Sequence, residues 1–106
     1  MKTVITSTGN DLNSKFDIHF GRSGWFCIYD SENKTTRFVE NASKNLNGGA
    51  GTKSAETVAE FGIKSVISGD FGPKAKTLLE ELKIQMIILH ESDLTVQDVI
   101  NKIKTN

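Results

Sequence analysis

From residue 65 onward, short apolar runs alternate with segments of helical periodicity, and this alternation constrains the fold more than any other feature. The runs at 65–68 and 86–89 are rich in Val, Ile and Leu, which is typical of strands. Between them, Pro73 opens a segment whose apolar residues recur at helical spacing: Ala75, Leu78, Leu79 and Leu82. A strand, a helix and a second strand in this order predict parallel strands joined by a right-handed crossover. The unbroken apolar run at 86–89 also predicts a strand covered on both faces.

The first half of the chain adds three strands and a helix. Apolar and β-branched residues predict strands at 3–6, 25–29 and 35–40, the last two forming a hairpin. A helix is predicted to begin near Thr52, and a last helix follows a capping box made by Thr95 and Asp98. The fold class is therefore α/β, with a mixed five-stranded sheet and helices packed on it. Residues 1–106 are expected to form a single domain.

Charge and cysteine content exclude several classes of protein. Thirteen Lys and Arg residues balance thirteen Asp and Glu residues, which argues against a nucleic-acid or anionic-membrane binder. The single cysteine, Cys27, rules out an internal disulfide or a multi-cysteine metal site, and it is predicted to pack as a small hydrophobic residue. Without an apolar run of about 20 residues or a signal peptide, a cytoplasmic location is expected.

Three loops are expected to meet at the carboxyl ends of the parallel strands, where α/β sheets usually bind ligands. They are the loop after the first strand, a glycine-rich loop at 48–51 and the junction at 68–72. The glycine-rich loop is not a P-loop, because Thr52 separates Gly51 from Lys53. Glycines before a helix can instead expose amides that suit an anion, or simply provide the conformations that a helix entry needs.

The segment 18–22, Ile-His-Phe-Gly-Arg, contains the two side chains best suited to a ligand. His19 can ligate a soft metal or a sulfide cluster through its imidazole, although a loop histidine is more often only solvated. Arg22 can neutralise an anion with several N–H donors. The usual hydrolase and metalloprotease motifs are missing, and the predicted buried strands hold no acidic residue. The sequence therefore indicates a binding protein and not an enzyme.

The chain resembles the dinitrogenase iron–molybdenum cofactor biosynthesis family. The resemblance lies in the order and spacing of four segments: His19 to Arg22, the 26–30 strand, Gly49 to Gly51 and residues 67–75. This family includes NifX-like carriers and the C-terminal domain of the maturase NifB. The resemblance implies a three-layer, ribonuclease-H-like motif with helices on both faces of the sheet. It also implies binding of an iron–sulfur or iron–molybdenum type cluster, without catalysis by the domain.

The same resemblance implies the site residues. His19 is the expected metal ligand, and the cofactor-binding set is His19, Gly21, Arg22, Gly49, Ala50, Gly51, Gly69 and Gly72. Other cofactor-assembly proteins are possible partners, while nucleic acid and membranes are not expected. The alternative is an anion- or nucleotide-binding regulatory module that uses the same glycine loops. A nuclease is suggested only by analogy of fold, which is a weak reason.

Overall fold

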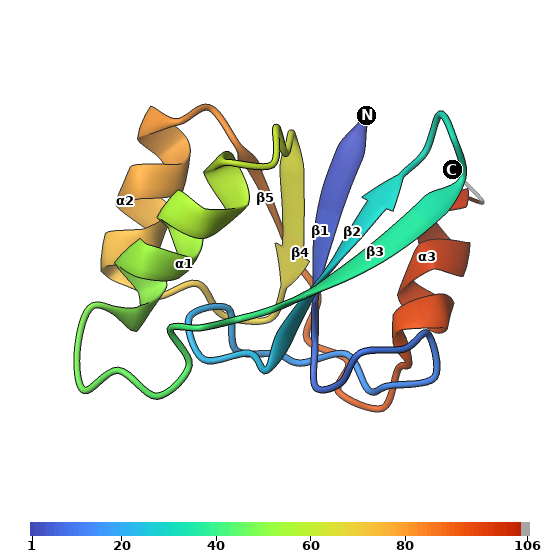
Figure 1. Cartoon of the computed structure of the whole chain (residues 1–106), viewed down its shortest axis with the longest axis horizontal. Helices are drawn as coiled ribbons and strands as arrows, with labels where there is room; N and C mark the ends of the chain where they lie inside the picture. Colours follow the sequence, from blue (N-terminus) through green and yellow to red (C-terminus); the bar gives the residue numbers. More distant parts are fainter. Residues whose placement is uncertain (105–106) are drawn as a thin grey trace.

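The computed structural model describes residues 1–104 and contains one five-stranded sheet and three helices (Figure 1). The strands are β1 (Lys2–Ser7), β2 (Trp25–Asp30), β3 (Thr35–Glu40), β4 (Ser65–Ser68) and β5 (Gln85–Ile88). The helices are α1 (Ala50–Ala59), α2 (Pro73–Glu81) and α3 (Val96–Lys104). The strand order is β3-β2-β1-β4-β5. The β1–β2 and β2–β3 pairs are antiparallel, whereas β1–β4 and β4–β5 are parallel, which confirms the predicted mixed sheet.

The sheet separates two hydrophobic cores, because successive residues of a strand face opposite sides. On β1, Val4 belongs to the core beneath α1 and α2, whereas Ile5 belongs to the core beneath α3. Both side chains are fully buried. Figure 1 shows α1 and α2 together on one side of the sheet and α3 on the other. The prediction of helices on both faces is therefore confirmed.

The last helix begins as the sequence predicts. The backbone N–H of Asp98 donates to Thr95 Oγ1 at 3.1 Å, and the Thr95 N–H donates to Asp98 Oδ2 at 3.0 Å. This reciprocal pair is a capping box with aspartate in place of glutamate. The helix buries Val96, Val99 and Ile100 against the sheet. None of the helices within residues 1–104 is long and apolar enough to cross a membrane.

Two predictions about local structure need correction. Helix α1 begins at Ala50 and not near Thr52, because Gly49 adopts a left-handed conformation with φ 75° and serves as the N-cap. Ala50 and Gly51 therefore lie in the first helical turn and not in a loop. Strand β5 is not covered on both faces, since it is the last strand of the sheet and Ile88 is 59% exposed.

The buried thiol on β2 makes stability depend on pH. Cys27 is fully buried among the residues beneath α3, and this desolvation raises the pKa of its thiol from 9.0 to about 12. The folded state thus holds the proton more tightly than the unfolded chain. The stabilisation is complete below pH 9 and is lost as the pH rises toward about 12.

We therefore expect the free energy of unfolding to fall more steeply between pH 9 and 11 in the wild type than in Cys27→Ala. The difference in slope should approach about 1.4 kcal/mol per pH unit. Denaturant unfolding at several pH values measures both slopes, and other titrating groups cancel in the comparison. Equal slopes would show that the thiol is not desolvated in the folded protein.

Candidate functional site

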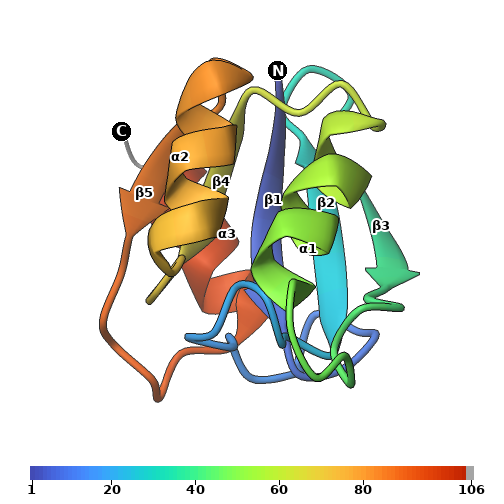
Figure 2. The same ribbon diagram turned by 90° about the vertical axis from the view of Figure 1, so that its left-hand side faces the viewer.

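Four loops meet at the carboxyl ends of β1, β4 and β5, which is the end of the sheet where α1 and α2 begin (Figure 2). They follow β1, β3, β4 and β5 and comprise residues 8–24, 41–49, 69–72 and 89–95. The expected meeting of the first-strand loop, the glycines before α1 and the 69–72 junction is thus observed. Parallel strands have brought these distant segments to one edge.

The segment that contains His19 is fastened to the junction after β4 as a short continuation of the sheet. The Gly69 N–H donates to the Ile18 carbonyl at 3.1 Å, and the Phe20 N–H donates to the Asp70 carbonyl at 3.0 Å. His19 and Asp70 accordingly form an isolated parallel bridge. The backbone of His19 is therefore held in place by pairing with the end of β4, even though it lies in a loop.

Gly69 permits this close approach because it has no side chain. A Cβ built at Gly69 would lie 2.6 Å from the Cβ of Ile18 and 2.9 Å from its carbonyl oxygen. Both distances are shorter than van der Waals contact, and the carbonyl belongs to the backbone hydrogen bond just described. Any side chain at this position must therefore push the His19 segment away from β4.

Accordingly, we expect Gly69→Ala to lower the free energy of unfolding by about 1–3 kcal/mol, which is typical of overpacking. Gly48→Ala is the matched control, since no atom lies within 4 Å of a Cβ built there. The control should change stability by no more than about 0.5 kcal/mol. Denaturant unfolding of both variants gives the comparison, and equal stability of the two would refute the close-packing argument.

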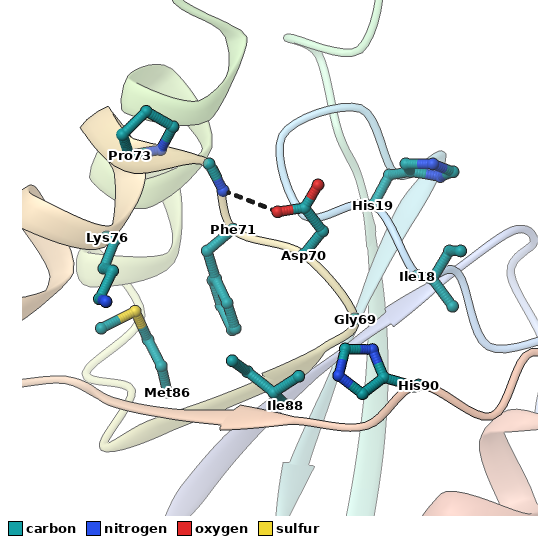
Figure 3. Close-up of a pocket in the computed structure, with 11 residues that line it drawn as sticks. Ile18, His19, Gly69, Asp70, Phe71, Pro73, Lys76, Met86, Ile88 and His90 are labelled. Atoms are coloured by element: carbon teal, nitrogen blue, oxygen red, sulfur yellow. Dashed lines mark hydrogen bonds between the residues drawn. The ribbon is translucent and has the colours of Figure 1, made fainter.

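A groove of about 750 Å³ lies beside this junction. Figure 3 shows that its walls come from the His19 segment, the β4–α2 junction, the first turns of α2 and the strand β5. The side chains of Phe71, Met86 and Ile88 make much of it apolar, whereas Lys76 and His90 bring nitrogen atoms to it. Asp70 is its carboxylate, and its Oδ1 accepts the Gly72 N–H at 3.2 Å. This hydrogen bond stabilises the turn before α2, and it does not cap that helix.

At the rim of the groove, a carboxylate orients the imidazole of His19. Asp17 Oδ1 lies 3.3 Å from His19 Nδ1 and also accepts the His19 backbone N–H at 3.0 Å. Because a carboxylate only accepts, Nδ1 carries the proton in this pair. In the neutral form of the ring the Nε2 lone pair is then available, and the His19 side chain is 66% exposed. A carboxylate–histidine pair of this kind is a common way to prepare an imidazole for a metal.

The predicted site residues divide into two groups. His19, Gly69 and Gly72 line the groove. The others lie at the same end of the molecule but outside its lining: Gly21, Arg22, Gly49, Ala50 and Gly51. A Cβ on Gly21 would meet the backbone of Gly51 at 2.9 Å, so the first loop packs directly on the start of α1. The Arg22 guanidinium donates to the Lys44 carbonyl at 3.1 Å and so fastens the 41–49 loop.

Sequence reasoning missed a buried amide that joins three of these segments. Asn41 is 1% exposed, and its Nδ2 donates to the Gly21 carbonyl at 3.1 Å. Its Oδ1 accepts the Ser43 N–H at 3.0 Å, and Ser54 of α1 donates to the same Gly21 carbonyl. A polar residue directly after a strand carries no signal that distinguishes this role from an ordinary turn.

The β5 side of the groove was also missed as part of the site. Met86, Ile88 and His90 recur at two-residue spacing and all line the groove. This spacing places residues on one face of an extended chain, so the pattern was visible in the sequence. Its meaning was hidden by the expectation that β5 is covered on both faces.

The Cys27 thiol does not line the groove, and the described residues contain no preformed metal-binding cluster of side chains. Cys27 lies in the core beneath α3 and not in the groove lining, in agreement with its predicted packing role. Across residues 1–104, no three His, Cys, Asp or Glu side chains are grouped so that they could hold a metal ion. Any metal-containing ligand would depend on imidazole, backbone and charge contacts.

Comparison with known proteins places this arrangement in a family. The family described as dinitrogenase iron-molybdenum cofactor matches residues 1–106. The chain belongs to the dinitrogenase iron-molybdenum cofactor family. This result confirms the resemblance inferred from the sequence, and it links the chain to proteins concerned with a metal cofactor.

Relatives of this family member are found in sequence and in structure. An uncharacterised protein of Methanocaldococcus jannaschii is 35% identical over 77 residues, which cover 70% of this chain and 65% of that protein. The apo form of the orange protein from Desulfovibrio gigas has a TM-score of 0.91 at 28% identity, covering 98% of this chain and 87% of that one. A candidate NifB protein from Thermotoga, of the DUF35 family, has a TM-score of 0.85 at 28% identity, with coverage of 99% and 88%.

Proposed function

We propose that this family member is a carrier for an iron–sulfur or iron–molybdenum type cluster, which it binds in the groove through His19 without performing catalysis. The observation that supports this most directly is the imidazole at the rim of the groove. Its Nδ1 faces Asp17 and its side chain is 66% exposed, so Nε2 is free to ligate. The family membership supports the nature of the cargo.

The rest of the groove suits a cluster that must later be released. Sulfide atoms are large and polarisable, and the apolar side chains of Phe71, Met86 and Ile88 offer them contact without hydrogen bonds. The Lys76 ammonium, which has no ion pair within residues 1–104, can balance part of a negative charge. With few ligating side chains, the bound cluster keeps open positions for transfer to other cofactor-assembly proteins.

The remaining predicted residues are proposed to support the site from outside its lining. Gly21, Gly49, Ala50 and Gly51 would hold the first loop against α1, and Arg22 would hold the 41–49 loop in place. We also propose that the fold is of the ribonuclease-H-like type. The strand order β3-β2-β1-β4-β5 with an antiparallel β2 supports that description.

An anion- or nucleotide-binding module is the second candidate function. Helices α1 and α2 both begin at this end of the sheet, and neither has a side-chain cap. Free amides at helix N-termini favour anions, and Lys76 stands one turn into α2. This reading requires no metal and would make His19 dispensable.

Competition between ligand classes separates the two functions. The protein is incubated anaerobically with iron, sulfide and molybdate, and the visible absorption of the desalted protein is recorded with and without excess phosphate or ATP. A carrier should acquire a chromophore that millimolar phosphate does not displace. Tight binding of phosphate or ATP, with no chromophore formed, would favour the regulatory module.

A further inference from the structure

A second histidine, far from His19 in the sequence, also lines the groove. His90 follows β5 and lines the groove together with His19. In Figure 3 its ring lies beside Gly69 and Ile88, whereas the His19 ring belongs to the segment on the other side of Gly69. The two histidines of this chain are therefore brought to one groove although 71 positions separate them.

The backbone holds His90 in this place. The Leu89 N–H donates to the Ser68 carbonyl at 3.0 Å, which extends the pairing of β4 with β5 by one residue beyond Ile88. Ser68 is followed directly by Gly69, whose N–H holds the His19 segment. The end of β4 thus positions both histidine segments through adjacent residues.

We propose that His90 is a second imidazole ligand for the proposed cluster, so that His19 and His90 hold different metal atoms of it. This inference rests on the proposed carrier function. A single ion would require three or four ligands around one point, and no such group exists among residues 1–104. A cluster instead offers separate metal atoms to two imidazoles that belong to different segments of the lining.

The apolar part of the groove lining, on the side of His90 away from His19, supports this class of cargo (Figure 3). Ile88 is 59% exposed although it is fully apolar, and it lines the groove together with Phe71 and Met86. A hard oxyanion such as phosphate gains nothing from such a surface, because it needs hydrogen-bond donors. Bridging sulfides can contact it over a wide area. Lys76 then supplies the positive charge that the apolar wall lacks.

The number of coordinating imidazoles can be counted directly. Wild-type protein and the variants His90→Ala and His19→Ala are labelled with ¹⁵N-histidine and reconstituted anaerobically with iron and sulfide. After reduction to a paramagnetic state, pulsed electron paramagnetic resonance measures the nitrogen couplings to the cluster. The wild type should show two histidine nitrogens and each single variant one. Affinity should fall at least tenfold in His90→Ala, since even the loss of an outer-sphere partner costs roughly that much.

Matched controls keep the result specific to these residues. Gln85→Ala alters an exposed residue of β5 outside the groove lining and should keep both couplings. Lys76→Gln should weaken binding, and more strongly at low salt. Lys74→Gln, two residues earlier in α2 and outside the groove lining, should not. A wild-type cluster with a single coupling that His90→Ala leaves unchanged would overturn this inference alone. A wild type that acquires no cluster would overturn the carrier function itself.

Discussion

Replacing Phe20 with alanine should lower the free energy of unfolding by about 3–5 kcal/mol, the range found for fully buried phenylalanines. The Phe20 side chain is completely buried. Its ring centroid lies 6.0 Å from that of Phe26 on β2 and 5.3 Å from that of Phe71, which lines the groove. Alanine would leave a cavity beside the rings of Phe26 and Phe71 and remove the buried apolar side chain that directly follows His19.

Denaturant unfolding measures this effect, with Leu82→Ala as the control. Leu82 is a large apolar residue that is 42% exposed at the end of α2, so its truncation should cost much less than the truncation of Phe20. A loss below about 1 kcal/mol in Phe20→Ala, comparable to that of the control, would contradict the close packing of Phe20 against Phe26 and Phe71.

His19→Ala should weaken cluster binding by at least tenfold while leaving the free energy of unfolding within about 0.5 kcal/mol of the wild type. The variant removes the proposed ligand, but the side chain is 66% exposed and adds little to either core. The backbone N–H bond to Asp17 does not depend on the side chain. Anaerobic titration followed by visible absorption, together with denaturant unfolding, gives both values.

A second variant distinguishes ligation from positioning. Asp17→Ala removes the carboxylate that faces Nδ1 but leaves Nε2 in place, so it should weaken binding less than His19→Ala does. An Asp17 variant that binds as weakly as His19→Ala, with an intact fold, would indicate that the loop and not the imidazole determines affinity.

Local patterns were sufficient to predict most of the secondary structure. The β2–β3 hairpin, the Pro73 start of α2 and the Thr95–Asp98 capping box depend on residues close in sequence. The prediction that β5 is covered on both faces was wrong, because an apolar run does not reveal whether a strand lies at the centre or the edge of its sheet. That position depends on the strand order, with β4 on one side of β5 and no strand on the other.

The sequence predicted only those parts of the site in which the type of residue by itself indicates a binding role. His19 and the glycines stood out by type and spacing, and the structure places them at one end of the sheet. Asp17, Asn41 and Lys76 did not, because their importance arises from contacts or lining created by the fold. The case of Ile88 is similar, since an exposed apolar residue becomes informative only when the surface around it is known.

Analysis of reconstituted protein decides whether this chain carries a metal–sulfur cluster at His19. Wild type and His19→Ala are incubated anaerobically with iron, sulfide and molybdate and then desalted. Metal and acid-labile sulfide are measured per chain, and circular dichroism confirms that both proteins are folded. We expect stoichiometric metal and sulfide on the wild type and a large loss of both in the variant. Equal amounts on both proteins, or none on the wild type, would contradict cluster binding at His19.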